Sequence, residues 1–158
     1  MSFEKGNNIK ILVVGDNITL NKIILDILNK KGFYVKCVLN AEDAYAFIKN
    51  NYKNTAMILD YILPSINASE FIRNLKNKGY NIPFIMMTSN SDRDTILEMM
   101  KLGAYDYIIK NDKFISSFPS VVYKFIDKLE MEMKLIASEN KLKEREKNLD
   151  YLQKMLKI

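Results

Sequence analysis

The stretch AMILDYILPS, residues 56–65, decides the fold, because it joins a buried strand directly to a charged residue. The apolar run 57–59 is typical of a strand that is covered on both faces. This run stops at Asp60, and three mostly apolar residues and Pro64 follow it. An ionised carboxylate at the edge of a core is costly unless something compensates its charge. Asp60 is therefore either the polar first residue of a loop or a residue held there for chemistry.

The same pattern recurs on both sides of this stretch. Short apolar runs that are typical of strands alternate with segments whose apolar residues have helical spacing. The predicted strands cover 9–15, 33–39, 56–60, 82–89 and 104–110. The predicted helices cover 17–32, 40–51, 68–79 and 91–103, and the first, third and fourth are expected to end at or near a glycine.

Local signals mark where these helices begin. Asn40 is a plausible N-cap, with Asp43 three residues further on. Ser91 and Asp94 are expected to open the helix over 91–103. Pro83 lies near the start of its predicted strand, where a missing N–H group is tolerated.

Five strand–helix repeats in roughly 115 residues imply an α/β fold, with a parallel sheet between helices on both faces. In open sheets of this kind, ligands bind beyond the carboxyl ends of the strands. Polar residues stand at or just after four of the predicted strand ends, and they are Asp16, Asp60, Thr88, Ser89 and Lys110. Loop composition alone is a poor explanation for all five, so we expect a site at this edge of the sheet.

Composition narrows the class of protein. The chain has 158 residues, of which 48% are hydrophobic, and this suits one globular domain with a real core. No apolar run approaches the ~20 residues of a membrane span, and the start MSFEKGNN lacks the apolar segment of a signal peptide. Cys37 is the only cysteine, which rules out an internal disulfide. We therefore expect a cytoplasmic protein that does not contact a membrane.

Charge and the missing histidine exclude further classes of function. The net charge is +5 with a pI near 9.1, but basic and acidic residues are interleaved, so we expect no direct binding of nucleic acid. The chain contains no histidine, which removes Ser-His-Asp and Cys-His catalysis, histidine-based metal sites and a phosphohistidine on this chain. Any chemistry here must use carboxylates, hydroxyls and lysines.

Residues 9–130 resemble the receiver domain of two-component response regulators. The segment LDYILPSINA, with Pro64 four positions after Asp60, resembles the phosphoacceptor motif of that family. The segment IMMTS carries the expected hydroxyl at Thr88, and GAYDYIIK ends at the expected Lys110. The resemblance implies a five-stranded parallel sheet in the flavodoxin-like order 2-1-3-4-5, within a (βα)5 three-layer sandwich.

The resemblance also implies roles for the residues at the sheet edge. Asp60 would take a phosphoryl group from a histidine kinase or a phosphotransfer protein, with Mg²⁺ as cofactor. The implied metal ligands are Asp16, Asp60 and the backbone carbonyl of Ile62. The implied phosphoryl-binding residues are Thr88, Ser89 and Lys110, and Thr88 would act with Tyr107 as the conformational switch. Such a domain catalyses its own phosphorylation but is not a turnover enzyme.

Three positions depart from the family pattern. Gly15 stands where receivers usually carry the first of two adjacent acids, so we expect weakened binding of Mg²⁺. Ala68 stands where glycine is usual, and Asn111 replaces the usual proline after Lys110. Receivers that precede sensor or histidine kinase domains often lack that proline, which points to this subtype.

Three other functions are alternatives to this one. A haloacid-dehalogenase-type phosphatase needs a second aspartate two residues after the nucleophile, where this chain has Ile62. A flavodoxin needs a phosphate loop rich in hydroxyls and glycine, and GDNITL is a poor one. The serious alternative is a receiver-like scaffold that no longer accepts phosphate and serves only in dimerisation or another protein interaction.

The carboxyl-terminal segment predicts one long helix. From Phe118 to the end the chain has no glycine, and Pro119 is its only proline. Val122, Phe125, Ile126 and Leu129 would complete the receiver as its fifth helix. We therefore expect an arm over 1–8, a receiver over 9–130 and a helical extension over 131–158. The chain would be a single-domain regulator or the amino-terminal part of a longer protein, such as a histidine kinase.

A heptad pattern follows this fifth helix. One position of the seam is held by Leu135, Leu142, Leu149 and Leu156, and the alternate position by Met131, Ser138, Arg145 and Leu152. About forty helical residues at ~1.5 Å each span ~60 Å, so the far half must leave the receiver. We expect a parallel homodimer through this coiled coil, which passes the receiver state to an output domain or partner. The alternative is a solvated, charged tail.

Overall fold

The computed structural model of the chain describes residues 9–89 and 92–157. The chain divides into two compact units, Met1–Val121 and Val122–Ile158. The predicted arm over 1–8 and the predicted helix start at Ser91 lie outside the described residues.

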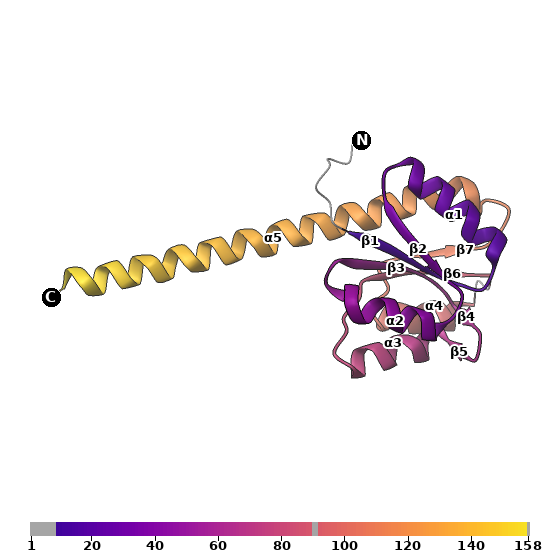
Figure 1. The fold of residues 1–158 in the computed structure, drawn as a ribbon, viewed down its shortest axis with the longest axis horizontal. Helices are drawn as coiled ribbons and strands as arrows, with labels where there is room; N and C mark the ends of the chain where they lie inside the picture. The colour runs from indigo at the N-terminus through magenta and orange to yellow at the C-terminus, as the bar shows by residue number, and fades with distance from the viewer. Residues whose placement is uncertain (1–8, 90–91, 158) are drawn as a thin grey trace. The chain divides into compact units, whose positions relative to one another are not determined.

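The first unit is built on a five-stranded parallel sheet in the order β2-β1-β3-β6-β7 (Figure 1). Its strands are β1 (Lys10–Val14), β2 (Tyr34–Val38), β3 (Thr55–Asp60), β6 (Phe84–Thr88) and β7 (Tyr107–Ile109). Because β6 and β7 are the fourth and fifth strands of this sheet, the predicted order 2-1-3-4-5 is confirmed.

Helices cover both faces of the sheet. They include α1 (Ile18–Lys30), α2 (Ala41–Asn51), α3 (Ala68–Asn77) and α4 (Arg93–Lys101), and a short 3-10 helix η1 (Tyr52–Asn54) follows α2. The last helix, α5 (Phe114–Leu156), begins in the first unit and continues into the second. Figure 1 shows α1 over one face, and α2, α3 and α4 over the other. This is the three-layer α/β arrangement that the alternating pattern predicts.

Alternation along the strands builds a core on each face. The face toward α2 and α3 buries Leu12, Val14, Met57, Leu59, Phe84 and Met86 together with Phe71 and Leu75 of α3. The residues between them, among them Ile11, Val13, Ile58 and Ile85, are also buried, as are Ile24 and Leu28 of α1. The central strands are therefore covered on both sides, which is why their sequences are continuous apolar runs.

The helix starts follow local capping chemistry. The side chain of Asn40 accepts a hydrogen bond from the backbone N–H of Asp43 at 2.8 Å, as predicted for α2. Asp92 caps α4 by accepting from the backbone N–H of Asp94 and from the hydroxyl of Thr95. Gly79 follows α3 with a φ of +84°, a conformation that costs glycine little.

A small hairpin lies between β3 and α3, where the sequence shows apolar residues and a proline. Strands β4 (Ile62–Leu63) and β5 (Ile66–Asn67) pair antiparallel around Pro64 and Ser65. Ser65 has a φ of +67°, which is consistent with a type II turn that has proline at its second position. The side chain of Leu63 is buried in the core, whereas that of Ile62 is 67% exposed.

Two elements differ in extent from their predictions. Strand β7 is limited to three residues, although the backbone N–H of Tyr105 still donates to the carbonyl of Phe84 at 2.9 Å. Helix α5 begins at Phe114, before the segment in which we predicted it. Asn111 explains the early start, because its side chain accepts from the backbone N–H of Lys113 and its carbonyl accepts from that of Phe114.

The second unit, Val122–Ile158, contains the larger part of α5, which continues without a break to Leu156. The predicted extended carboxyl-terminal helix is confirmed. Val122, Phe125, Ile126 and Leu129 are buried, whereas every described residue after Glu132 is exposed. Within the described ranges, no helix combines the length and the apolar character that a membrane crossing requires.

Candidate functional site

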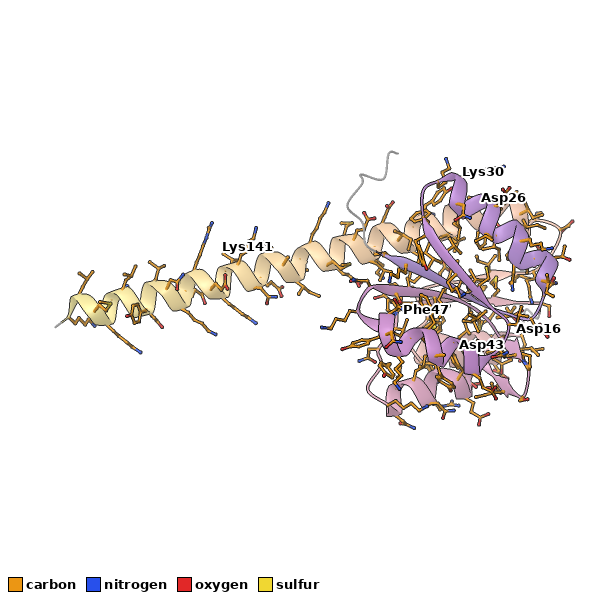
Figure 2. All side chains as sticks on the ribbon, in the orientation of Figure 1. Asp16, Asp26, Lys30, Asp43, Phe47 and Lys141 are labelled. Atoms are coloured by element: carbon orange, nitrogen blue, oxygen red, sulfur yellow. The ribbon has the colours of Figure 1, made fainter. Side chains whose placement is uncertain are left out.

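The strand register places the end of β1 beside Asp60. Val14 pairs with Leu59, so the residues that follow them, Gly15 and Asp60, are level at the carboxyl edge of the sheet. Asp16 comes next and leads into α1, and its side chain is exposed (Figure 2). The predicted juxtaposition of the first and third strand ends is therefore present.

The other side of Asp60 is set by β6 and β7. Asp60 pairs with Met87, so Thr88 lies one residue further toward the same edge. Thr88 in turn pairs with Ile109, and the backbone N–H of Lys110 donates to the carbonyl of Thr88 at 2.7 Å. The sheet therefore delivers Lys110 to the edge at which Asp60 ends its own strand.

Asp60 and Lys110 form an ion pair. The ammonium nitrogen of Lys110 lies 2.7 Å from the Oδ2 atom of Asp60. The side chain of Asp60 is only 6% exposed and that of Lys110 is 23% exposed. A carboxylate that is removed from water needs a compensating charge and hydrogen bonds. Lys110 supplies both, so Asp60 can end a buried strand.

The remaining residues that we predicted for phosphoryl binding and switching differ in position. Thr88 is buried and 2% exposed, at the end of the strand next to Asp60. Ser89 follows it with an exposed side chain, and Tyr107 on β7 is 37% exposed. Among the described residues, no hydrogen bond joins the side chain of Ser89 or Tyr107 to Asp60. The structure thus brings Asp60 and Lys110 together, buries Thr88 on the next strand, and leaves Ser89 and Tyr107 at the surface.

The donor set at this edge suits a hard cation with few protein ligands. Asp16 and Asp60 provide carboxylate oxygens, and the chain beyond Asp60 provides the backbone carbonyl of Ile62. Mg²⁺ prefers oxygen ligands and keeps several waters, so two carboxylates and a carbonyl fit it. Within the described ranges, no group of three or more acidic, cysteine or histidine side chains is arranged to hold a metal. The donor types of these residues are those that Mg²⁺ prefers, and their assignment as its ligands stays a prediction.

Gly15 lies directly against the phosphoacceptor candidate. A Cβ atom added to Gly15 would lie 3.3 Å from the Cβ of Asp60 and 3.5 Å from its Oδ2. The first of these distances is tighter than an ordinary van der Waals contact, so a side chain at this position would press on Asp60. A side chain at position 15 would therefore reduce the space beside Asp60, and a charged one would also change the charge there.

Asn21 is a residue of this site that the sequence did not suggest. It is buried on α1, and its side-chain Nδ2 donates to the carbonyl of Gly15 at 2.8 Å. Its Oδ1 lies 3.7 Å from the position of the added Cβ on Gly15. Asn21 thus holds the β1–α1 loop that carries Asp16. The sequence signal that could have identified Asn21 is its spacing from Ile24 and Leu28, which places a polar residue on the buried face of α1.

The chain is similar to known proteins over most of its first unit. The model of the response regulator receiver domain matches residues 11–115. The transcriptional regulatory protein FixJ of Rhizobium meliloti (strain 1021) is 34% identical over 98 residues, which cover 62% of this chain and 48% of FixJ. The chain therefore spans about half the length of full-length relatives such as FixJ.

Solved structures give the same result. The crystal structure of FixJ-N superposes with a TM-score of 0.63 and 30% identity, covering 75% of this chain and 90% of that one. The signal receiver domain of a signal transduction histidine kinase from Syntrophus aciditrophicus has a TM-score of 0.63 and 27% identity, covering 75% and 89%. The range 11–115 includes Asp60 and Lys110, and the chain belongs to the response regulator receiver domain family.

Proposed function

We propose that Asp60 is the phosphoacceptor of a two-component relay and takes its phosphoryl group from a histidine kinase or a phosphotransfer protein. The observation that carries this proposal is the ion pair of 2.7 Å between Asp60 and Lys110 at the carboxyl edge of the sheet. A carboxylate in a nearly buried position, with a lysine ammonium beside it at the place where such sheets bind ligands, is suited to attack a phosphorus atom.

The reaction that we propose is a phosphoryl transfer. A carboxylate oxygen of Asp60 forms a bond to phosphorus while the bond from phosphorus to the donor's imidazole nitrogen breaks, and the electron pair leaves with that nitrogen. The ammonium of Lys110 already lies at the carboxylate, so it reduces the repulsion between two anions and then pairs with a phosphoryl oxygen. Thr88, on the neighbouring strand, would donate its hydroxyl to another phosphoryl oxygen.

Mg²⁺ is part of the proposal. Asp16, Asp60 and the carbonyl of Ile62 would hold it, and when bound it would neutralise charge on the transferring phosphoryl group. Because Gly15 contributes no carboxylate next to Asp60, we propose that this chain binds the ion more weakly than receivers with two adjacent acids. Asn21 would support the site by fixing the loop that carries Asp16.

The proposed readout of phosphorylation runs from Thr88 to Tyr107. Tyr107 pairs with Met86 across β6 and β7, and Met86 is two residues before Thr88 on the same strand. Because side chains two apart share a sheet face, Thr88 and Tyr107 are on the same face. A movement of the Thr88 hydroxyl toward the phosphoryl group would open space for Tyr107, which is only partly exposed.

We also propose that the receiver passes its state through its last helix, as a dimer, to an output domain or a partner in the cytoplasm. In the protein from Syntrophus aciditrophicus a receiver of this fold is part of a signal transduction histidine kinase. This supports the proposal that the present chain is a receiver of the subtype that precedes sensor or histidine kinase domains. Asn111, in place of the usual proline after Lys110, supports the same subtype.

The test is incubation with a small phosphodonor, acetyl phosphate, in the presence of Mg²⁺, followed by intact-mass measurement. We expect a single phosphoryl adduct in the wild-type chain and none in Asp60→Ala or after chelation of the metal. Asp43→Ala, which removes an exposed carboxylate on α2 (Figure 2), is the matched control and should still be modified. Absence of any adduct would instead favour the alternative, a receiver-like scaffold that acts only in protein interactions.

A further inference from the structure

An apolar seam follows the exposed part of α5. Six apolar side chains repeat with heptad spacing, and each is at least 53% exposed. They are Met131, Leu135, Leu142, Leu149, Leu152 and Leu156. A regular row of this kind on one helix is poorly stabilised in water and favours burial against another helix. We call this row the seam face.

The seam face is distinct from the buried side of the same helix. At 3.6 residues per turn, Met131 points about 160° away from Leu129, and Leu135 about 120° away. Leu129 belongs to the buried side, together with Val122 and Ile126. Burial of that side therefore leaves the seam face open, so it needs a partner of its own.

The charges beside the seam face decide which partner fits. Leu135, Leu142, Leu149 and Leu156 take heptad position a, and the series that begins at Met131 and ends at Leu152 takes position d. The charged residues at the flanking positions e and g then have opposite signs. Position e holds Glu132, Glu139, Glu146 and Gln153, and position g holds Lys134, Lys141, Asn148 and Met155, so every charged residue at e is acidic and every charged residue at g is basic. The side chains of Lys134, Glu139, Lys141 and Glu146 are exposed, as Figure 2 shows for Lys141.

We infer that the seam face is covered by a second copy of this chain in a parallel, in-register, two-stranded coiled coil. In a parallel pair, position g faces position e of the next heptad on the partner. Lys134 then meets the partner's Glu139, and Lys141 meets the partner's Glu146. In an antiparallel pair, g faces g and e faces e, so lysine would oppose lysine and glutamate would oppose glutamate. The charges thus select the parallel orientation.

The sequence also sets the limits of the coiled coil. Upstream of Met131, the next a position is Lys128, whose charge is unfavourable in an apolar seam. The next g position is Asp127, which would face the like charge of the partner's Glu132. The seam therefore begins at Met131. Inside the seam, Ser138 and Arg145 occupy d positions. Polar residues at core positions lower stability but fix register and strand number. A long Arg145 side chain can direct its charged end to solvent from a two-stranded interface more readily than from a larger bundle.

This inference deepens the dimer of the proposed function, naming its orientation and the residues that select it. It is independent of phosphorylation, because it concerns side chains of the second unit alone. A parallel pair joins equivalent positions of the two helices from Met131 to Leu156. Any rotation or shift of one helix is therefore felt by the other along the whole seam face.

Charge exchange provides the first test, carried out on the full chain without any phosphodonor. We compare Lys134→Glu/Lys141→Glu, Glu139→Lys/Glu146→Lys and an equimolar mixture of the two by sedimentation equilibrium. Each variant alone faces like charges, so its dimer Kd should rise on the order of 100-fold. The mixture restores every e–g attraction and should dimerise like the wild type. Lys143→Glu/Lys147→Glu changes the net charge equally at outward positions and should alter Kd far less.

Disulfide trapping provides the second test, which reports orientation. In a Cys37→Ser background, Leu152→Cys places one thiol at a d position, where a parallel in-register dimer brings it against its own copy. An antiparallel pairing of the same seam would hold the two thiols ~25 Å apart. We expect rapid cross-linking of Leu152→Cys and little for Lys147→Cys, which faces outward. Circular dichroism establishes that every variant keeps its helix.

Several results would overturn the inference. The wild-type chain could be monomeric at high micromolar concentration, could form a trimer or tetramer, or could form a dimer that survives truncation at Lys134. The dimer Kd could also be insensitive to the charges at positions e and g, or the cross-link at position 152 could be absent. None of these results would bear on phosphorylation of Asp60, because acetyl phosphate labelling is measured separately on the same chain.

Discussion

The ammonium of Lys110 lies 2.7 Å from a carboxylate oxygen of Asp60, although 50 positions separate the two residues in the sequence. The contact exists because β3 and β7 both flank β6 and end at the same edge of the sheet. It explains how a buried strand can end on a carboxylate side chain. It also places a cation where an incoming phosphoryl group would need one.

Removing the lysine should destabilise the fold. We expect Lys110→Ala to lower the free energy of unfolding by about 1–3 kcal/mol, because it leaves a nearly buried carboxylate without its charged partner. Urea denaturation measures the loss. Asp60→Asn should remove most of the penalty in the double variant, and Lys22→Ala, an exposed lysine on α1, is the control. Equal losses in the Asp60 and Asp60→Asn backgrounds would mean that the ion pair contributes no coupling.

The same lysine should matter for the response to phosphorylation. Lys110→Ala should still accept some phosphoryl group, because the nucleophile is intact, but it should not convert that event into a conformational change. We expect beryllofluoride with Mg²⁺ to shift the backbone amide NMR signals of β6 and β7 in the wild type and much less in Lys110→Ala. A variant that responds like the wild type would show that Lys110 has another role.

Position 15 should control the affinity for magnesium. Gly15→Asp adds a carboxylate beside Asp60, so we expect Mg²⁺ to bind about tenfold more tightly. Titration followed by tyrosine fluorescence measures the affinity, because the chain has no tryptophan. Gly15→Ala separates space from charge, since it adds the close Cβ atom alone and should bring no gain. Equal affinities of the wild type and Gly15→Asp would contradict the assigned metal site.

Ile62 should prolong the life of the phosphorylated state. Its side chain is 67% exposed and is two residues beyond Asp60, so it places an apolar group where a polar one could orient water. We expect Ile62→Asn to speed the loss of the phosphoryl group roughly three- to tenfold. Ile62→Val keeps the position apolar and should leave the decay rate unchanged. A rate that stays constant or falls in Ile62→Asn would contradict the prediction.

The sheet and its paired residues could be predicted because they follow from long patterns. Strands that are covered on both faces leave continuous apolar runs, and the parallel alternation with helices brings their carboxyl ends to one edge. Asp60 and Lys110 could therefore be assigned to the same site from their places after two such runs. The cap at Asn40 was equally accessible, because it depends only on neighbours within one turn.

Other features depend on contacts that leave little trace in the sequence. The hairpin of β4 and β5 has two residues in each strand, too few for an alternating pattern, and its turn uses Pro64 and Ser65 where hairpin turns usually contain glycine or asparagine. Asn21 interrupts the apolar face of α1. Its hydrogen bond to the carbonyl of Gly15 depends on the path that the chain takes after β1, which the sequence of α1 does not reveal. The early start of α5 depends on two hydrogen bonds that the side-chain oxygen and the carbonyl of Asn111 accept from backbone N–H groups.

Chemical trapping of the modified residue tests the central claim most directly. After reaction with acetyl phosphate and Mg²⁺, borohydride reduces an aspartyl phosphate to homoserine, and peptide mass spectrometry then locates the converted residue. We predict homoserine at position 60 and at no other aspartate, with conversion lost when Mg²⁺ is chelated. Homoserine at another aspartate, or none in a chain that remains folded, would contradict the assignment of Asp60 as phosphoacceptor.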